Sequence, residues 1–236
     1  MLYSTVRKTL ALVFFFSVGF LFGQSSSQDG TTSTAYAIPT NSNLEISGDI
    51  TLEAWLRPNA AQSNIGNVLM KGSYGYAFGI MNDGTIAFWQ SGSQNSGPES
   101  TTSIVQDGST WTHVAIVNEG GVGTTFYING VAVGSNATGG SFQTQAGDLY
   151  IGRQGAGCSC NFFNGLVDEV RVWNDVRTAG EIAANYDQVV SGSEQGLAAY
   201  YRFNEGSGTT ILDEVTATSY TPSVNSITWD AEESIT

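Results

Sequence analysis

The stretch that most constrains the fold runs from Leu166 to Trp173, where apolar and polar side chains alternate. A period of two residues is typical of a strand that buries one face and exposes the other. The residues after it predict one short helix near residues 178–187, because Thr178 can cap the first turn and Glu181, three residues later, can bond back to it. The sequence therefore indicates a half-buried strand that runs into a short capped helix.

Turn signals elsewhere predict antiparallel pairing. Asn82-Asp83-Gly84 and Asn129-Gly130 each separate two strand-like runs, as in tight β-hairpins. With 29 Gly and 4 Pro in 236 residues, the composition suits many short strands joined by polar turns. We expect one all-β domain, an antiparallel two-sheet sandwich, rather than two small domains. The strand candidates are residues 50–57, 68–71, 76–81, 85–90, 111–117, 124–128, 131–133, 149–152, 166–173, 197–203, 211–212 and 227–229.

The N-terminus predicts a signal peptide over residues 1–23. Arg7 and Lys8 precede an apolar run, and Gly23 offers a small residue for cleavage. The run is roughly 13 residues, short of the about 20 that span a bilayer. An uncleaved anchor is the alternative. The mature protein is expected to be exported, either secreted or associated with the cell surface. Residues 24–35 are rich in Ser, Thr, Gln and Gly and are expected to be a disordered lead-in to a domain over residues 36–230.

The charge of the predicted mature chain excludes some partners. Loss of residues 1–23 leaves six basic and 21 acidic residues, a net charge of −15. Such a surface repels phosphate backbones and anionic lipids, so nucleic acid binding and membrane insertion after signal cleavage are not expected. The acidity fits either simple solubility or attraction of divalent cations.

Cys158 and Cys160 are the only cysteines. In an oxidising compartment they can form a disulfide that pins a loop, although the ring is very small and contributes little loop entropy. Inert thiols, an intermolecular pair or a reactive site are the alternatives.

Five segments, taken in order, resemble the laminin G-like (LamG-like) jelly-roll domains of the concanavalin A-like lectin/glucanase superfamily. The resemblance covers roughly residues 36–186 and implies a jelly-roll sandwich. The segments are Ile50 to Pro58, Trp111 to Ala115, Phe126 to Val131, Leu149 to Arg153 and Asn164 to Trp173.

The segment from Gly196 to Thr210 is similar to the one that usually opens such a domain, but here it trails. Residues 197–230 therefore either fold back and complete this sandwich, as in a permuted arrangement, or begin a truncated repeat.

The resemblance does not extend to a catalytic motif. Enzymes of the superfamily that cut β-glucans carry Glu-x-Asp-x-(x)-Glu on one strand, which places acid and nucleophile on one face. The nearest approach here is Asp168-Glu169, and neighbouring strand residues point to opposite faces. His113 is the only histidine and is expected to be structural. We therefore expect a non-catalytic domain.

Many relatives bind calcium, which prefers six to eight oxygen ligands. The resemblance implies Asp168 as a calcium ligand, joined by Asp213 and Glu205 if the trailing segment folds back. The alternative for Asp168 is a carboxylate that accepts hydrogen bonds from loop amides. The residues after Asp213, Glu214-Val215-Thr216, depart from the Ser-Gly-Asn-Gly loop of many members, which weakens this ligand set.

Aromatic residues near a polar loop are candidates for ligand binding, because sugar faces stack on exposed rings. Trp89, Tyr74 and Tyr76 border the polar loop 91–103. Loops 136–147 and 153–161 are expected to add to the rim.

The sequence thus predicts an exported, non-catalytic recognition module that binds a polysaccharide, a cell-surface glycan or a surface or matrix protein, stabilised by calcium. The alternatives are a glycoside hydrolase acting on O-glycosyl bonds of polysaccharides, and a structural domain of an adhesive (cell adhesion) assembly.

Overall fold

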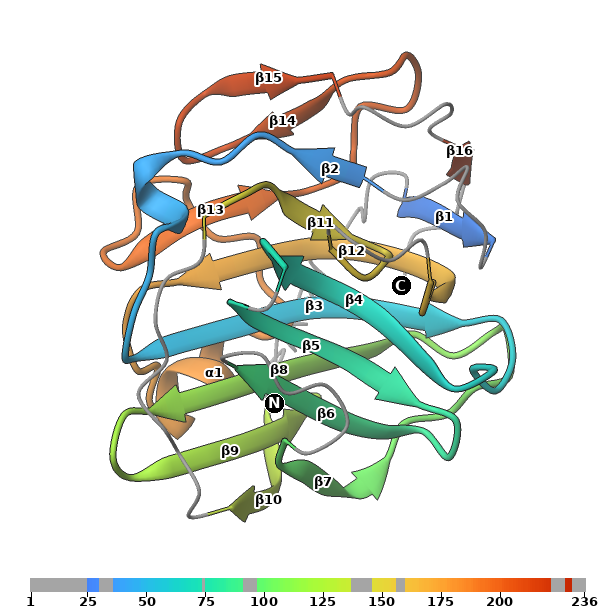
Figure 1. The fold of residues 1–236 in the computed structure, drawn as a ribbon, viewed down its shortest axis with the longest axis vertical. Helices are drawn as coiled ribbons and strands as arrows, with labels where there is room; N and C mark the ends of the chain where they lie inside the picture. The colour runs from blue at the N-terminus through green and yellow to red at the C-terminus, as the bar shows by residue number, and fades with distance from the viewer. Residues whose placement is uncertain are drawn as a thin grey trace, which may run out of the picture.

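The computed structural model describes residues 25–29, 36–73, 75–90, 97–136, 146–155, 160–221 and 228–230. These residues form two antiparallel sheets and one short α-helix, so the predicted all-β sandwich is confirmed. Figure 1 shows the smaller sheet in front of the larger one. None of the helices in the described part of the chain combines the length and the apolar character that crossing a bilayer requires.

The larger sheet has ten strands. Their order is β10 (Val131–Asn136), β9 (Gly123–Ile128), β8 (Thr112–Glu119), β3 (Ile50–Pro58), β12 (Asn164–Trp173), β13 (Leu197–Tyr201), β14 (Ile211–Asp213) and β15 (Thr218–Tyr220), with β1 (Ser25–Asp29) beside β12 and β16 (Thr228–Asp230) beside β1.

The smaller sheet has six strands. Their order is β2 (Tyr36–Ile38), β11 (Leu149–Ile151), β4 (Ile65–Lys71), β5 (Tyr76–Met81), β6 (Thr85–Gln90) and β7 (Glu99–Ser103). Part of the loop expected over residues 91–103 is therefore strand β7. Its side chains gave no apolar pattern, and its main chain pairs with the edge of β6.

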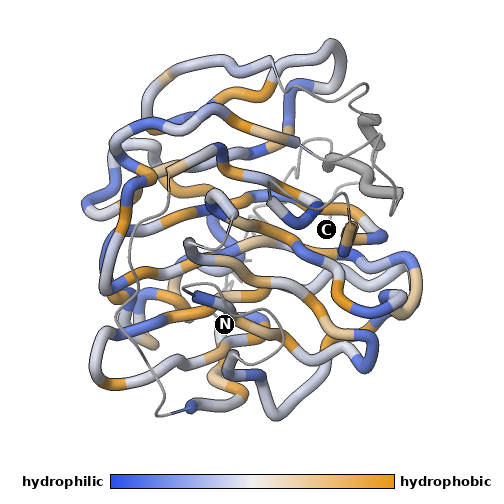
Figure 2. The backbone as a smooth tube through the Cα atoms, viewed as in Figure 1, coloured by the Kyte–Doolittle hydropathy of each residue, from blue (hydrophilic) through white to orange (hydrophobic). Residues whose placement is uncertain are grey.

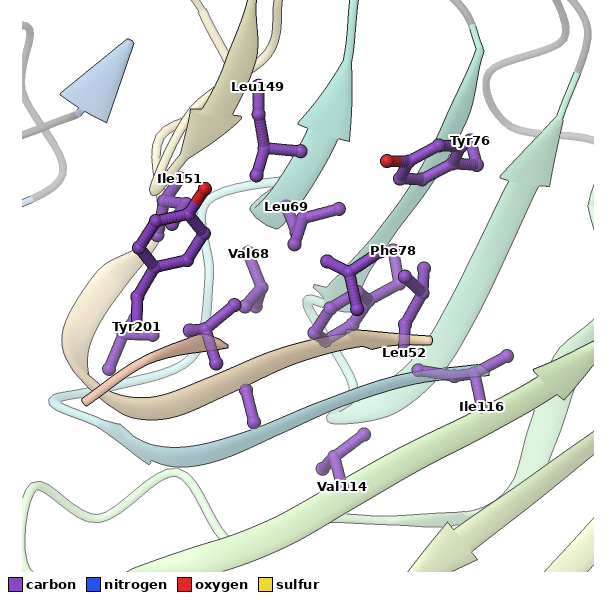
Figure 3. Packing of buried hydrophobic residues seen from close by; sticks show 14 of the residues in the cluster. Leu52, Val68, Leu69, Tyr76, Phe78, Val114, Ile116, Leu149, Ile151 and Tyr201 are labelled. Carbon is purple, nitrogen blue, oxygen red and sulfur yellow. The ribbon is translucent and has the colours of Figure 1, made fainter. Parts of the chain in front are cut away.

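The core lies between the two sheets, where alternate apolar side chains of both form one buried cluster. Leu52 of β3 and Ile116 of β8 meet Val68 of β4 and Phe78 of β5 (Figure 3). Figure 2 shows hydrophobic and hydrophilic residues alternating along many strands. This period of two places the intervening residues on the outer face of each sheet.

Helix α1 (Ala179–Asn185) covers part of the outer face of the larger sheet, where Ile182 packs with Ala115 and Tyr127. The predicted capping box is present. The Thr178 side chain accepts from the Glu181 amide, and the Glu181 side chain accepts from the Thr178 amide.

The trailing segment belongs to this sandwich. Strand β13 pairs with β12, with Tyr201 opposite Val170, and β14 follows it in the same sheet. Strands β13, β14 and β15 therefore lie in the larger sheet of this sandwich.

The lead-in expected to be disordered contains a strand. Residues Ser25–Asp29 form β1, which pairs with residues 164–167 of β12, along the edge that β13 leaves open beyond Val170. Main-chain pairing needs no apolar side chains, so composition gave no signal. The predicted signal peptide lies outside the described residues and remains a prediction.

Candidate functional site

The smaller sheet is apolar on its outer face as well as in the core. In β6, Ala87 and Trp89 alternate with the core residues Ile86 and Phe88. We call this surface, on the side away from the larger sheet, the outer face. Its apolar residues are Ala37, Ile65, Met70, Ala77, Ala87, Trp89 and Tyr150, with Met81 packed against them.

Four of these residues form a row across neighbouring strands. Tyr150 of β11 pairs with Met70, Met70 with Ala77, and Ala77 with Trp89 of β6. Residues paired in register lie on the same face. The row spans three strand spacings, or about 14 Å at roughly 4.8 Å each. It thus places an aromatic ring at each end and a small residue between.

A second row runs beside the first. Asn67 of β4 pairs with Gly79, and Gly79 with Ala87 of β6. Gly79 must lack a side chain, because a Cβ there would lie 2.5 Å from the carbonyl oxygen of Gly66. The second row therefore carries a polar amide at one end, and the main chain of residues 66 and 67 packs closely against Gly79.

Residues 153–155 pack over the Tyr150 end of the row. The Arg153 guanidinium lies 5.0 Å from the centre of the Tyr150 ring, and its Nε donates to the carbonyl oxygen of Gln154. The Gly155 amide contacts Sδ of Met70 at 2.9 Å. The Tyr150 hydroxyl is protonated at neutral pH and can donate a hydrogen bond, and burial raises its pKa further above the ordinary value. These residues belong to the loop 153–161 expected at the rim.

Of the predicted ligand-binding aromatics that the structure describes, Trp89 lies on this face and Tyr76 does not. Trp89 lies on it and is 3% exposed in the whole chain. Tyr76 points into the core, is fully buried, and donates from its hydroxyl to the carbonyl oxygen of Leu44 at 3.3 Å. It cannot offer a ring to a ligand, because the register pairs Ala77, not Tyr76, with Trp89. Tyr74 lies outside the described residues.

Sequence reasoning missed Tyr150 and Asn67. Tyr150 stands between Leu149 and Ile151, and three apolar residues in succession hide which of them faces outward. Asn67 precedes a β-bulge, which a pattern of strict alternation does not predict.

The residues predicted to bind calcium do not form a ligand set. Asp213 accepts from the amides of Tyr200 and Val215 and from the Thr216 hydroxyl, at 3.2, 3.1 and 2.9 Å. Its carboxylate therefore closes the turn after β14.

Asp168 and Glu205 are also committed to local contacts. Asp168 accepts from the Glu169 amide at 2.8 Å, and Glu205 from the Leu212 amide at 2.7 Å. Burial, reinforced by the Glu169 charge, holds the pKa of Asp168 well above its usual value. Within the described ranges no three His, Cys, Asp or Glu side chains gather as a metal would require, so these residues do not fit a shared calcium site.

The predicted disulfide cannot be placed. Cys158 lies outside the described residues, while Sγ of Cys160 lies 3.0 Å from Oε1 of Gln154. The bridge remains a prediction.

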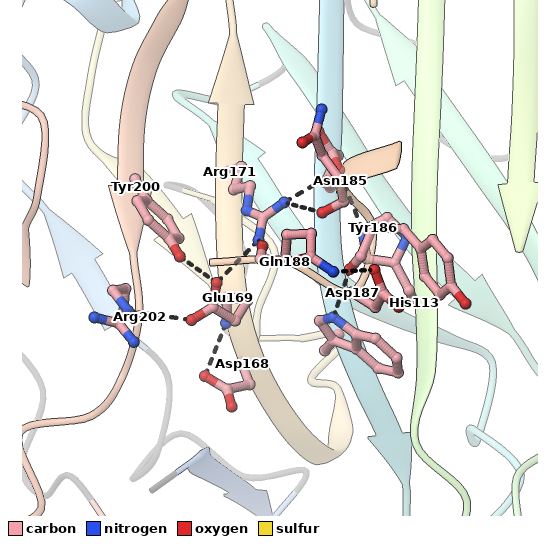
Figure 4. A network of polar contacts seen from close by, with 12 residues as sticks. His113, Asp168, Glu169, Arg171, Asn185, Tyr186, Asp187, Gln188, Tyr200 and Arg202 are labelled. Atoms are coloured by element: carbon pink, nitrogen blue, oxygen red, sulfur yellow. Dashed lines mark hydrogen bonds and ion pairs between the residues drawn. The ribbon is translucent and has the colours of Figure 1, made fainter. Parts of the chain in front are cut away.

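A buried charge network lies on the side of the larger sheet that faces away from the smaller sheet (Figure 4). Arg171 lies 3.8 Å from Oε2 of Glu53 and 3.0 Å from Oε2 of Glu169. Oε2 of Glu53 also lies 3.1 Å from Nε2 of His113. Glu169 takes further hydrogen bonds from the Tyr200 hydroxyl and from Arg202.

The protonation states in this network follow from burial and pairing. Burial alone would raise the pKa of Glu53, but the His113 hydrogen bond and the Arg171 charge outweigh it and leave the pKa below its usual value. Burial lowers the pKa of His113 more than the Glu53 carboxylate raises it. A neutral imidazole therefore donates from Nε2 to an ionised Glu53.

The network fastens helix α1 to the sheet. Arg171 donates to the carbonyl oxygens of Asn185 and Gln188 at 3.1 and 2.6 Å, and Trp55 Nε1 donates to that of Tyr186 at 3.0 Å. A cationic donor at a helix C-terminus satisfies carbonyls that lack partners in the helix. Both buried carboxylates thus contact Arg171 beneath the end of α1, and Glu169 also pairs with Arg202.

Comparisons with known proteins agree with the fold. A family model described as the concanavalin A-like lectin/glucanases superfamily matches residues 29–183. Comparison with curated proteins gives no match.

Solved structures with the same fold are distant in sequence. A Bacteroides ovatus protein, provisionally described as carbohydrate-binding, is 21% identical with a TM-score of 0.69, over 89% of this chain and 60% of its own. Domain 4 of a Geobacillus stearothermophilus arabinanase, in complex with arabinotriose, is 18% identical with a TM-score of 0.53, over 70% and 76%. A Ruminococcus gnavus sialidase module bound to α2,3-sialyllactose is 15% identical with a TM-score of 0.54, over 69% and 97%.

Proposed function

The chain belongs to the concanavalin A-like lectin/glucanases superfamily, and on that basis we propose that it is a carbohydrate-binding domain that holds a glycan on the outer face of its six-stranded sheet. We propose further that it acts after export, as a non-catalytic recognition module.

The row Tyr150–Met70–Ala77–Trp89 carries this proposal. The C–H face of a sugar ring packs on an aromatic ring, while nearby polar groups bond its hydroxyls. Ala77 and Ala87 put small side chains next to Trp89 on the same face, which leaves the ring free of bulky neighbours on these two sides. Asn67 and the Tyr150 hydroxyl supply polar groups within the same surface.

The comparisons support a glycan as the ligand. Two of the similar structures hold an oligosaccharide, and a third is described as carbohydrate-binding. Those ligands differ from one another, so they support the class of ligand and not a particular sugar.

The observed carboxylates do not favour hydrolysis as a second function. Glu53 and Glu169 come together only through Arg171 and are buried under α1. Reducing-sugar release from β-glucans, agars and carrageenans is the assay that would bring the hydrolase alternative back.

The test uses the predicted mature chain, residues 24–236, because this is the form that export would release. In the full-length chain Trp89 and Tyr150 are 3% and 8% exposed. A polysaccharide array identifies a ligand, and calorimetry gives its dissociation constant. Trp89→Ala is expected to weaken binding at least about tenfold, as truncation of a central tryptophan does. Acrylamide quenching reports whether Trp89 is accessible in the mature form.

The matched control is Trp111→Ala, which removes a half-buried tryptophan that precedes β8 on the larger sheet. It should bind like the parent. The proposal fails if the mature chain binds no polysaccharide, or if both tryptophan variants bind equally well.

A further inference from the structure

Asn67 is the polar residue of the outer face whose burial the fold does not explain. Its side chain is fully buried, and neither Oδ1 nor Nδ2 has a hydrogen-bond partner among the described residues. Its main-chain amide is paired, since it donates to the carbonyl oxygen of Asn161 at 3.0 Å, and in the ladder with β5 the residue lies opposite Gly79. An unpaired buried amide lowers the stability of the fold, so its presence suggests a partner from outside the fold.

Asn118 is a buried asparagine of the same protein whose side-chain amide is hydrogen-bonded within the fold. It is also fully buried, on β8, but its Nδ2 donates to the carbonyl oxygen of Gly48 at 3.3 Å. Its Oδ1 accepts from the Thr124 hydroxyl at 3.1 Å. The sandwich therefore can satisfy a buried amide where the amide serves packing alone.

The register places the Asn67 side chain beside the aromatic row. Asn67, Gly79 and Ala87 are paired across three strands on the face that carries Trp89. The bulge at Val68 puts both Val68 and Leu69 into the core, so Asn67 and Met70 both face outward. A Cβ at Gly79 would lie 2.5 Å from the carbonyl oxygen of Gly66 and 3.1 Å from Cα of Asn67, so the main chains of β4 and β5 pack closely at this point.

We propose that Asn67 determines specificity by binding two adjacent hydroxyls of a sugar. Nδ2 donates to one hydroxyl oxygen, and Oδ1 accepts from the hydroxyl beside it, which uses both unpaired atoms at once. The amide is uncharged and the predicted mature chain carries −15, so the ligand is a neutral glycan with a free vicinal diol. This inference rests on the proposed function and deepens it.

The test compares Asn67→Ala with Asn118→Ala in the mature chain. The probes are neutral trisaccharides of xylose, glucose, mannose and arabinose, together with monodeoxy analogues of the tightest binder. Asn67→Ala is expected to weaken binding by at least about tenfold, the effect of losing two hydrogen bonds. Its melting temperature should equal or exceed that of the parent, because the variant removes two unpaired polar atoms. Asn118→Ala should melt lower and bind normally.

The deoxy analogues separate this role from a general loss of binding. The parent should bind an analogue that lacks one hydroxyl of the diol more weakly than it binds the full sugar. Asn67→Ala should bind the analogue and the full sugar with equal affinity. The inference is overturned if Asn67→Ala binds like the parent, or if it is destabilised as much as Asn118→Ala. If the parent binds none of these sugars or any other on the array, it is the proposed function that fails, and the inference with it.

Discussion

At the scale of single residues, Arg171 joins the larger sheet to helix α1 through a side chain that is 1% exposed. Its guanidinium contacts two carboxylates, the carbonyl oxygen of Asn185 at the end of α1 and that of Gln188 just beyond it, which uses most of its donors. A buried ion pair adds little net stability, but removing one partner leaves the other as an unpaired charge in a low dielectric. A substitution at any charged residue of this network is therefore expected to leave a buried charge without its partner.

His113 gives this network a pH dependence. Burial lowers its pKa in the folded state, below the ordinary value of 6.5, so the unfolded chain takes up the proton first as the pH falls. The contribution of His113 is fully present above the unfolded pKa of 6.5 and is lost as the pH falls through the lower pKa of the folded state. The groups that face the ring are Glu53, Arg171, Glu169, Trp55 and Tyr186.

We expect His113→Gln to lose less stability over this range than the parent. Urea unfolding at several pH values measures it. The difference between parent and variant isolates the histidine from Asp168, whose raised pKa acts in the opposite direction because the folded state keeps its proton longer. Parallel stability curves for the two proteins would contradict the assignment.

Asp213 offers a separate test of the calcium binding predicted from the sequence. Asp213→Ala removes the acceptor of two amides and one hydroxyl, and should cost about 2–4 kcal/mol of unfolding free energy. Because this role is local, the loss should be the same in calcium and in EDTA. A loss that appears only with calcium present would show that the carboxylate binds the metal.

At the scale of strands, the row across β11, β4, β5 and β6 sets the length of the ligand. The two aromatic ends are about 14 Å apart, which exceeds the reach of one sugar ring. A glycan that contacts both must run across the strands, and only longer oligosaccharides can do so.

Binding should therefore tighten with the number of sugar rings. Tyr150→Ala is expected to weaken binding of trisaccharides and longer chains several-fold and to leave binding of the monosaccharide unchanged. Calorimetry over a length series measures this. Tyr220→Ala, on β15 of the larger sheet, is the control and should bind like the parent. An equal effect of Tyr150→Ala at every length would contradict the row as the binding surface.

Alternation predicted the strands but not all of their faces. β3 follows it, and its Glu53 and Trp55 stand on the face opposite Leu52 and Ala54 as a period of two requires. β4 does not, because Val68 is an extra residue in the ladder with β5.

The bulge in β12 likewise has no sequence signature. Glu169 has a φ of 50°, a left-handed conformation, and the register with β3 shifts between Asp168 and Arg171. The expectation that Asp168 and Glu169 simply alternate thus could not anticipate a network in which Glu169 meets Arg171. The aromatic row depends on pairings between β11, β4, β5 and β6, and no local pattern states which strands become neighbours.

At the scale of the molecule, the trailing strands complete the sandwich. Tyr201, Phe203 and Ile211 are fully buried in the core shared by both sheets. Resemblance alone left open a truncated repeat, because the same segment usually opens a domain of this kind.

A chain of residues 24–196 should therefore fail to fold. It loses these core side chains and exposes an edge of β12, while Glu169 and Arg171 lose Tyr200 and Arg202. Circular dichroism during thermal unfolding measures this, with residues 24–236 as the control. Cooperative melting of the shorter chain would favour the truncated repeat.

Strand β1 begins at Ser25, two positions after the predicted cleavage point at Gly23. A peptidase needs its substrate extended and free of other partners, whereas these residues are paired with β12 and β16 once the sheet has formed. If residues 1–23 are a cleaved signal peptide, processing must come before this part of the sheet closes. Cleavage would then set the point at which β1 can pair with its neighbours. An affinity tag fused directly at Gln24 would disturb the sheet more than one separated by a linker.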